Sequence, residues 1–245
     1  MDKGAVLILG AGSDIGIAVA EAFAQRGYAI QLAARKPDML EAARAGLATK
    51  HGLPVTSHAF DALATETHAG FISGLPELPQ IAVCAVGLMG EQSGSETDSQ
   101  AAARVMRSNF EGPASILGEL ANGFEARGSG TLVGISSVAG ERGRATNYVY
   151  GAAKAGFTAF LSGLRNRLAK KGVHVVTILP GFVNTQMTKG MELPAKLTAE
   201  PQEVAEAIVR AVTTGKNVIY VRPVWRLIMA IIRNIPERMF KKMKL

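Results

Sequence analysis

The chain has 245 residues, of which 48% are hydrophobic and 19% charged, and its formal net charge at pH 7 is +7. Such a chain is long and apolar enough to fold as one α/β domain, which excludes a disordered protein. Because Cys84 is the only cysteine, the composition excludes an intramolecular disulfide and a thiolate zinc cage. We find no signal peptide and no apolar run long enough to span a membrane, so we expect a cytoplasmic protein.

The predicted elements alternate between strands and helices along the chain. Ala5 to Leu9 is a short apolar run typical of a buried strand, and helical spacing follows from Ile15 to Arg26. Further strands are predicted at 28–33, 55–60, 81–86, 130–135, 173–179 and 218–221, and further helices after Pro37 and at 100–124, 148–169 and 201–213. This alternation predicts a single-domain α/β fold with a doubly wound, parallel, seven-stranded, Rossmann-like sheet over residues 1–221, followed by a C-terminal appendage at 222–245.

A glycine-rich turn lies between the first strand and the first helix. Glycines there let the backbone approach a diphosphate at the helix N-terminus, where free N–H groups favour anions. The turn therefore predicts a dinucleotide site formed by Gly10, Gly12, Ser13, Asp14, Ile15 and Gly16. We expect the Asp14 side chain to cap the helix and to point away from the phosphates.

The residues that follow the second and third strands bear on the choice of cofactor. No carboxylate follows the second strand to hold the ribose hydroxyls of NAD, and Arg35 stands where it can bind a 2′-phosphate, which favours NADP(H). Lys36 is interpreted as a solvated neighbour. Asp61, after the third strand, either accepts a hydrogen bond from the adenine amino group or caps the next helix.

Tyr150 and Lys154 are one helical turn apart and share a helix face. A lysine ammonium at that spacing stabilises the phenolate and lowers the pKa of the tyrosine, which makes it a proton donor and acceptor near neutral pH. Ser137 precedes Tyr150 by 13 residues, at the end of a predicted strand, and Asn109 lies in the preceding long helix. These four residues are the candidate catalytic group.

The sequence resembles the short-chain dehydrogenase/reductase family in its single-domain form. The segments that carry the resemblance are GAGSDIG at 10–16, FDA at 60–62, ISSVAG at 135–140, Tyr150 with Lys154, and LPGFVNT at 179–185. The resemblance implies that Tyr150 is the general acid/base, that Lys154 binds the nicotinamide ribose, that Ser137 orients the substrate carbonyl and that Asn109 holds a water. It also implies a homodimer or homotetramer.

The same resemblance extends the cofactor site beyond the glycine turn. Besides Arg35, Tyr150 and Lys154, it implies contacts to NADP(H) from Asp61, Ala62, Ala85, Gly87, Pro180, Gly181, Val183 and Thr185. Two departures stand out: Asp14 replaces a glycine of the family pattern, and Cys84 to Gly87 replaces the family's Asn-Asn-Ala-Gly. We interpret the second change as structural.

The C-terminal segment carries the net charge of the chain. Between Lys216 and Leu245 there are eight basic residues and one acidic residue, so the rest of the chain has no net charge. Trp225, Leu227, Ile228, Met229, Ile231 and Ile232 would form a wide apolar face of a helix there. This helix either covers the core or a second copy of the chain, or lies on an anionic membrane surface, such as the inner face of the cell membrane.

The sequence thus favours an NADP(H)-dependent oxidoreductase that interconverts a ketone and a secondary alcohol. Related reductases with a similar C-terminus imply a hydrophobic or lipid-linked substrate, and the loop at 186–199, with Met187 and Met191, is a predicted apolar lid. The alternative is a nucleotide-binding, membrane-associated scaffold without turnover. Scattered histidines predict no metal site, and the lack of stacking aromatics in the basic segment disfavours nucleic acid.

Overall fold

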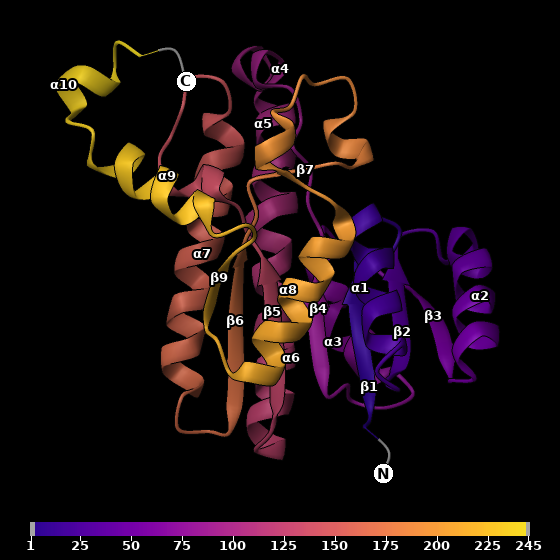
Figure 1. Ribbon diagram of the computed structural model, residues 1–245. Coiled ribbons are helices and arrows are strands. Elements are labelled where there is room, and N and C mark those ends of the chain that lie inside the picture. The colour runs from indigo at the N-terminus through magenta and orange to yellow at the C-terminus, as the bar shows by residue number, and fades with distance from the viewer. Residues whose placement is uncertain (1–2, 244–245) are drawn as a thin grey trace.

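The computed structural model describes residues 3–243, so Lys244 of the predicted basic segment lies outside it (Figure 1). Its centre is a parallel seven-stranded sheet with the strand order β3-β2-β1-β4-β5-β6-β9. The strands are β1 (Ala5–Leu9), β2 (Ala29–Ala34), β3 (Val55–Ala59), β4 (Ile81–Cys84), β5 (Gly130–Ile135), β6 (Val173–Leu179) and β9 (Val218–Tyr220). The predicted fold class is confirmed.

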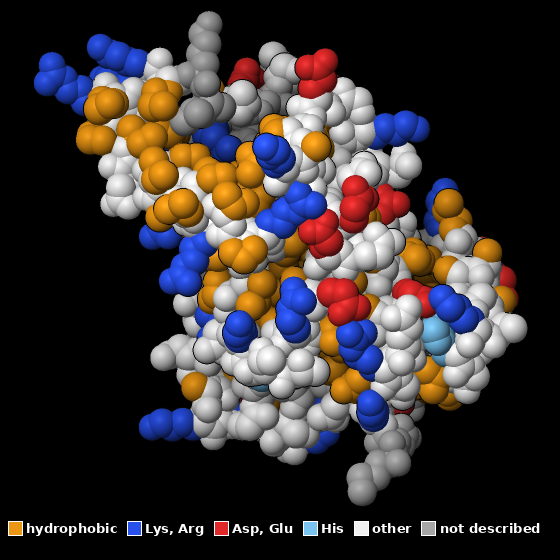
Figure 2. Space-filling view, in the orientation of Figure 1, with side chains coloured by type: hydrophobic (Ala, Val, Ile, Leu, Met, Phe, Trp, Pro, Cys, Tyr) orange, Lys and Arg blue, Asp and Glu red, His pale blue; other side chains and the backbone are white. Residues whose placement is uncertain are grey.

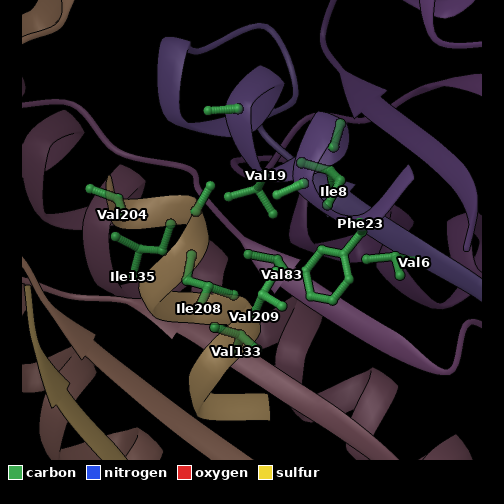
Figure 3. Close-up of a cluster of buried hydrophobic side chains, with 14 of the residues drawn as sticks. Val6, Ile8, Val19, Phe23, Val83, Val133, Ile135, Val204, Ile208 and Val209 are labelled. Carbon is green, nitrogen blue, oxygen red and sulfur yellow. The ribbon is translucent and has the colours of Figure 1, made fainter. Parts of the chain in front are cut away.

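Helices cover both faces of this sheet. One face carries α1 (Asp14–Ala24), α2 (Glu41–His51) and α8 (Pro201–Thr214), and the other carries α3 (His68–Ser73), α6 (Gly112–Arg127) and α7 (Tyr148–Leu168). Successive side chains of β1 point to opposite faces, so Ile8 packs in the first core, which Figure 3 shows, and Leu7 packs in the second. A central strand of a parallel sheet is buried on both faces, which explains its continuous apolar run.

The prediction of one continuous helix at 100–124 is wrong. The chain forms α4 (Gln92–Thr97), α5 (Ser99–Met106) and then a π-helical segment (Arg107–Glu111) before α6 begins. Proline has no N–H, so Pro113 cannot donate the α-helical hydrogen bond to the carbonyl of Asn109 four residues earlier. The wider π turn accommodates this loss, and it holds Asn109 in a buried position.

The C-terminal segment forms α9 (Val224–Asn234) and α10 (Glu237–Phe240). Trp225 and Met229 are buried, and they pack against Val138 and Leu179. The part of the apolar stripe that contains Trp225 therefore covers the core, as in the first of the alternatives drawn from the sequence. Ile228 and Ile232 are half-buried, and the exposed residues of that stripe are Val224, Leu227 and Ile231. The division of the chain at residue 222 stays a prediction.

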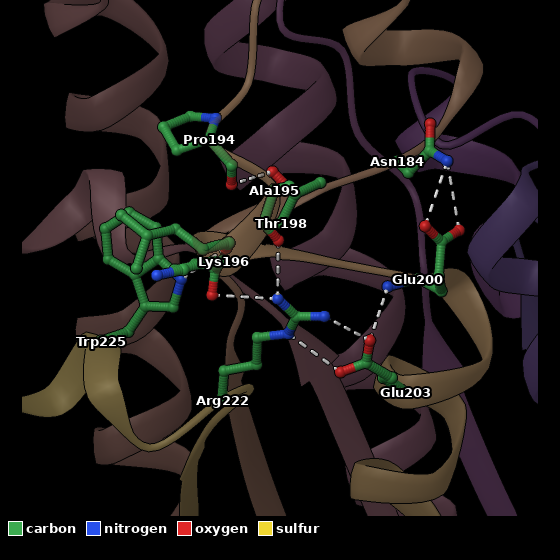
Figure 4. Close-up of polar contacts among 10 residues, drawn as sticks. Asn184, Pro194, Ala195, Lys196, Thr198, Glu200, Glu203, Arg222 and Trp225 are labelled. Carbon is green, nitrogen blue, oxygen red and sulfur yellow. Dashed lines mark hydrogen bonds and ion pairs between the residues drawn. The ribbon is translucent and has the colours of Figure 1, made fainter.

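Two arginines attach this segment to the rest of the fold. Arg222 has a positive φ of 60°, and its guanidinium forms an ion pair of 2.7 Å with Glu203 and donates to the carbonyls of Ala195 and Lys196 (Figure 4). Arg142 donates to the carbonyls of Arg233 and Ile235 and pairs with Glu237, so it caps the C-terminal end of α9.

Candidate active site

A pocket opens at the carboxyl ends of the central strands. Its wall comes from segments that follow β4, β5 and β6, namely 85–87, 136–139 and 180–183, and from Tyr150 and Lys154 of α7. The strand order reverses between β1 and β4, and in open α/β sheets ligands bind at this switch point. The topology therefore puts the pocket where a dinucleotide is expected.

The glycine turn after β1 has the geometry of a diphosphate site. Gly10 has a φ of +84°, and a Cβ there would lie 3.0 Å from the backbone of Ala85, so a larger residue does not fit. Ser13 Oγ accepts a hydrogen bond of 3.0 Å from the Gly16 N–H and caps α1. Among residues 3–243, no acceptor faces the N–H groups of Gly12, Asp14 and Ile15. These donors fit the diphosphate of a dinucleotide.

Asp14 does not make the predicted helix cap. Its Oδ2 accepts a hydrogen bond of 2.8 Å from the Gln186 N–H, which lies in the segment after β7 (Phe182–Val183). The prediction is wrong because the neighbouring Ser13 already supplies the capping oxygen, which leaves the Asp14 carboxylate to bind a distant backbone amide.

The residues after β2 and β3 lie on the adenosine side of the turn. Arg35 follows β2 directly and is exposed, and its guanidinium makes no hydrogen bond or ion pair with any residue in the described part of the chain. Asp61 Oδ1 accepts a hydrogen bond of 3.0 Å from the Leu63 N–H in the turn after β3. The capping alternative is wrong, because the next helical segment begins only at Thr65 and has no side-chain cap. Ala62 beside it is buried against Gly112.

Ser137, Tyr150 and Lys154 come together in the pocket. Burial raises the pKa of the Tyr150 phenol to about 12, and a hydrogen bond with Ser137 opposes this rise. Burial lowers the pKa of Lys154 to about 8. Its Nζ donates to the Ile135 carbonyl at 3.0 Å and lies 5.7 Å from the centroid of the Tyr150 ring. The predicted lowering of the phenol pKa is not found, because the effect of burial is larger than that of the hydrogen bond with Ser137.

Asn109 reaches the same place from the π-helical segment. Its Nδ2 donates to the carbonyls of Leu88 and Val105 at 2.6 and 2.8 Å. Its Oδ1 and the Nζ of Lys154 lie 3.2 and 3.7 Å from the point where a Cβ of Gly87 would stand. A side chain at residue 87 would therefore come between Asn109 and Lys154. Ser137, Tyr150 and Lys154 line the pocket, whereas Asn109 is fully buried behind it.

The family model described as short chain dehydrogenase matches residues 4–195, a range that contains all of these residues. The chain belongs to the short-chain dehydrogenase family. An uncharacterized oxidoreductase of Mycobacterium tuberculosis is 38% identical to this short-chain dehydrogenase over 99% of the chain and 98% of the relative. An uncharacterized oxidoreductase of Streptomyces coelicolor is 34% identical over 97% of the chain and 95% of the relative. Both comparisons extend beyond residue 195 into the C-terminal helices.

Solved structures share the fold of this short-chain dehydrogenase. A short-chain dehydrogenase from Sphingobium yanoikuyae in complex with NADPH superimposes with a TM-score of 0.82 at 23% identity, over 96% of the chain and 97% of the neighbour. A bulky-bulky ketone specific alcohol dehydrogenase from Comamonas testosteroni gives 0.80 at 22% identity, over 97% and 96%. At these identities the likeness concerns the fold.

Most of the predicted cofactor residues border the pocket of the short-chain dehydrogenase. Those that line it are Ile15, Ala85, Gly87, Tyr150, Lys154, Pro180, Gly181, Val183 and Thr185, and Met187 and Met191 of the predicted lid join them. Gly12, Ser13 and Asp14 line an adjoining hollow with Thr185. Ser136 also lines the pocket, but its hydroxyl donates to the carbonyl of Lys154 at 3.0 Å and supports α7.

The pocket also contains residues that sequence reasoning missed or assigned elsewhere. They include Met89, Val138, Arg144, Asn147, Phe182 and Trp225. The Trp225 indole packs edge-on against Phe182 with the ring centroids 5.4 Å apart, and its Nε1 donates to the Leu197 carbonyl at 3.1 Å. The only signal in the sequence was that the single tryptophan lies on an amphipathic helix. Arg144 and Asn147 lie in a loop without a motif.

Proposed function

We propose that this short-chain dehydrogenase interconverts a ketone and a secondary alcohol with NADP(H). The observation that carries the proposal is the gathering of Ser137, Tyr150 and Lys154 in one pocket beside the dinucleotide turn. The nicotinamide, when bound, gives or takes the hydride at the carbonyl carbon. Tyr150 carries its proton at neutral pH, because its pKa is about 12, and it donates that proton to the carbonyl oxygen as negative charge develops there.

The other three residues assist this proton transfer. The Ser137 hydroxyl, already bonded to Tyr150, orients the carbonyl oxygen. The ammonium of Lys154 faces the ring and stabilises the phenolate that remains after the proton has left. Asn109 holds the Leu88 backbone beside Lys154 and supports a water that returns the proton.

Arg35 supports NADP(H) over NAD(H). The guanidinium follows β2 without a partner in the described chain, where it is free to bind a 2′-phosphate, and no carboxylate stands there to repel one. The similar dehydrogenase from Sphingobium yanoikuyae is in complex with NADPH. We propose that the residues predicted from the sequence to contact the cofactor bind NADP(H) in this pocket and at the glycine turn.

The test measures the oxidation of NADPH in the presence of each of a panel of hydrophobic ketones. The loss of NADPH absorbance reports the rate. Tyr150→Phe should lower turnover by at least about a hundredfold and leave NADPH binding intact, since it removes the proton donor and keeps the ring. The matched control is Tyr148→Phe, an exposed tyrosine on the same helix. Equal rates in Tyr150→Phe and the parent would overturn the mechanism. NADPH binding without turnover of any carbonyl would favour the scaffold instead.

An exposed apolar patch on the C-terminal helices supports peripheral contact with an anionic lipid surface. Val224, Leu227 and Ile231 of α9 are exposed, as are Met239 and Met243, and Figure 2 shows hydrophobic side chains gathered over these helices with basic ones at the rim. The basic residues of this patch without partners in the described chain are Arg226, Arg238, Lys241 and Lys242. Within residues 3–243, no helix is long and apolar enough to cross a bilayer. A lipid-bound substrate would suit this location.

Membership of the family also supports assembly as a homodimer or homotetramer. Light scattering at micromolar concentration tests this assembly directly. A monomer would contradict it without affecting the proposed reaction.

A further inference from the structure

The charged residues that line the pocket are both cations. Lys154 belongs to the catalytic group, and Arg144 comes from the loop between Ser137 and Tyr150. In the part of the chain that the structure describes, no aspartate or glutamate lines this pocket. A pocket of this composition favours a negatively charged ligand over a neutral or positive one.

Arg144 differs sharply from Arg142 two residues earlier. Arg142 is satisfied: it donates to backbone carbonyls at the end of α9, pairs with Glu237 and lies 4.0 Å from the centroid of the Phe240 ring. The Nε of Arg144 is buried without a hydrogen-bond partner, and its guanidinium forms no ion pair with any described carboxylate. Burial lowers the pKa of Arg144. A guanidinium still remains charged at neutral pH.

Arg144 is half-buried, and a guanidinium nitrogen that is buried without a partner inside a pocket is typical of a site that a ligand completes. Asn147 adds to this site. It lines the same pocket, and its Oδ1 is also buried without a partner. The Asn147 N–H donates to the Arg144 carbonyl at 3.0 Å, which closes a turn that carries both side chains. After rotation of its amide, Asn147 can offer N–H groups to the ligand that binds Arg144.

We infer that the substrate of this short-chain dehydrogenase carries an anionic group, a carboxylate or a phosphate, which Arg144 binds with the help of Asn147. The inference rests on the proposed reaction and specifies its substrate class. Arg144 is a specificity residue that contacts the substrate away from the reacting carbon. The apolar remainder of the substrate lies against Met89, Met187 and Met191, so the substrate is amphipathic.

Turnover provides the first experiment. With NADPH, a series of medium-chain oxo acids should be reduced with a kcat/KM about ten to a hundred times that of their methyl esters, as expected for one charge-assisted hydrogen-bonded pair. Arg144→Gln should remove this preference by raising KM for the acids, and Arg144→Lys should keep part of it. The control Arg104→Gln removes one exposed positive charge outside the pocket. It should change neither the preference for acids over esters nor KM for the acids. Equal reduction of acids and esters by the parent protein would overturn the inference.

Calorimetry provides a second readout that does not depend on turnover. Dodecanoate and dodecyl phosphate, titrated into the protein with NADPH, should bind about tenfold or more weaker to Arg144→Gln, whereas methyl dodecanoate should bind both proteins equally. The tighter of the two anions identifies the headgroup. If no ketone is reduced but Arg144→Gln loses anion binding, the proposed reaction fails and the anion site stands. If both anions bind Arg144→Gln and the parent alike, the anion site is wrong.

Discussion

The indole of Trp225 lies directly on the backbone of Gly181, so closely that a Cβ at residue 181 would overlap the ring. Gly181 belongs to the segment after β6, and Trp225 belongs to the C-terminal helix α9. This contact makes α9 part of the pocket wall, because both residues line the same space.

The contact predicts a strong coupling between two substitutions. Trp225→Ala should cost about 3–5 kcal/mol of stability because it leaves a cavity. Gly181→Ala should cost about 1–3 kcal/mol because the ring must shift. In the Trp225→Ala background, Gly181→Ala should cost almost nothing, since the overlapping ring is gone. Urea denaturation of the four proteins measures this coupling, and strictly additive losses would contradict the packing.

Arg35 should determine the choice of cofactor. We expect NADPH to bind more tightly than NADH, and Arg35→Ala should weaken NADPH binding by about ten- to a hundredfold and leave NADH binding unchanged, because only NADPH has the 2′-phosphate. Fluorescence titration measures both affinities. Lys36→Ala, at the next exposed position, is the control and should have a smaller effect. Tighter binding of NADH by the parent protein would refute this interpretation.

Lys154 should give the reduction a pH dependence. Burial lowers its pKa from 10.5 to about 8, so the ammonium is present below pH 8 and is lost as the pH rises through that value. Tyr150 stays protonated over this range, because its pKa is about 12. The rate of ketone reduction should therefore be level near pH 6–7 and should fall above about pH 8. In Lys154→Met the slow residual rate should lack this inflection. A rate of ketone reduction that stays level up to pH 10 in the parent protein would contradict the role assigned to Lys154.

The exposed patch on α9 should bind anionic vesicles. The protein should co-sediment with phosphatidylglycerol vesicles at low salt and detach partly as salt rises, since screening acts over about 8 Å at physiological ionic strength. Leu227→Ser with Ile231→Ser should remove the salt-resistant part, whereas the control Met39→Ser, an exposed residue near α2, should not. If the protein does not sediment with the vesicles at low salt, lipid binding by this patch is contradicted, and a protein partner is favoured instead.

Features with a short-range signature could be predicted from the sequence. The glycine turn and the pair of Tyr150 and Lys154 have fixed spacings that follow from the geometry of a turn and a helix. The strands of the sheet were recognisable as short apolar runs, since parallel strands are buried on both faces. The π-helical segment was missed, although Pro113, which has no N–H to donate, stands two residues after it.

Contacts between distant segments could not be predicted in the same way. An amphipathic pattern shows which side of α9 is apolar, but it does not say that Trp225 is covered by Phe182 while Leu227 is left exposed. Arg144 has no local pattern at all, and only its lack of a partner in the folded pocket distinguishes it from Arg142. These side chains depend on tertiary packing that no sequence period encodes.

The hydrogen bond between Asp14 and the Gln186 N–H joins positions 172 residues apart, and it has a kinetic consequence. It links the glycine turn, where we expect the cofactor diphosphate, to the segment whose Met187 and Met191 line the pocket. A dinucleotide that binds at the turn therefore also fixes the wall against which the substrate must bind. Addition should be sequential and ordered, with the cofactor first, so that NADP⁺ inhibits competitively against NADPH while the alcohol product does not.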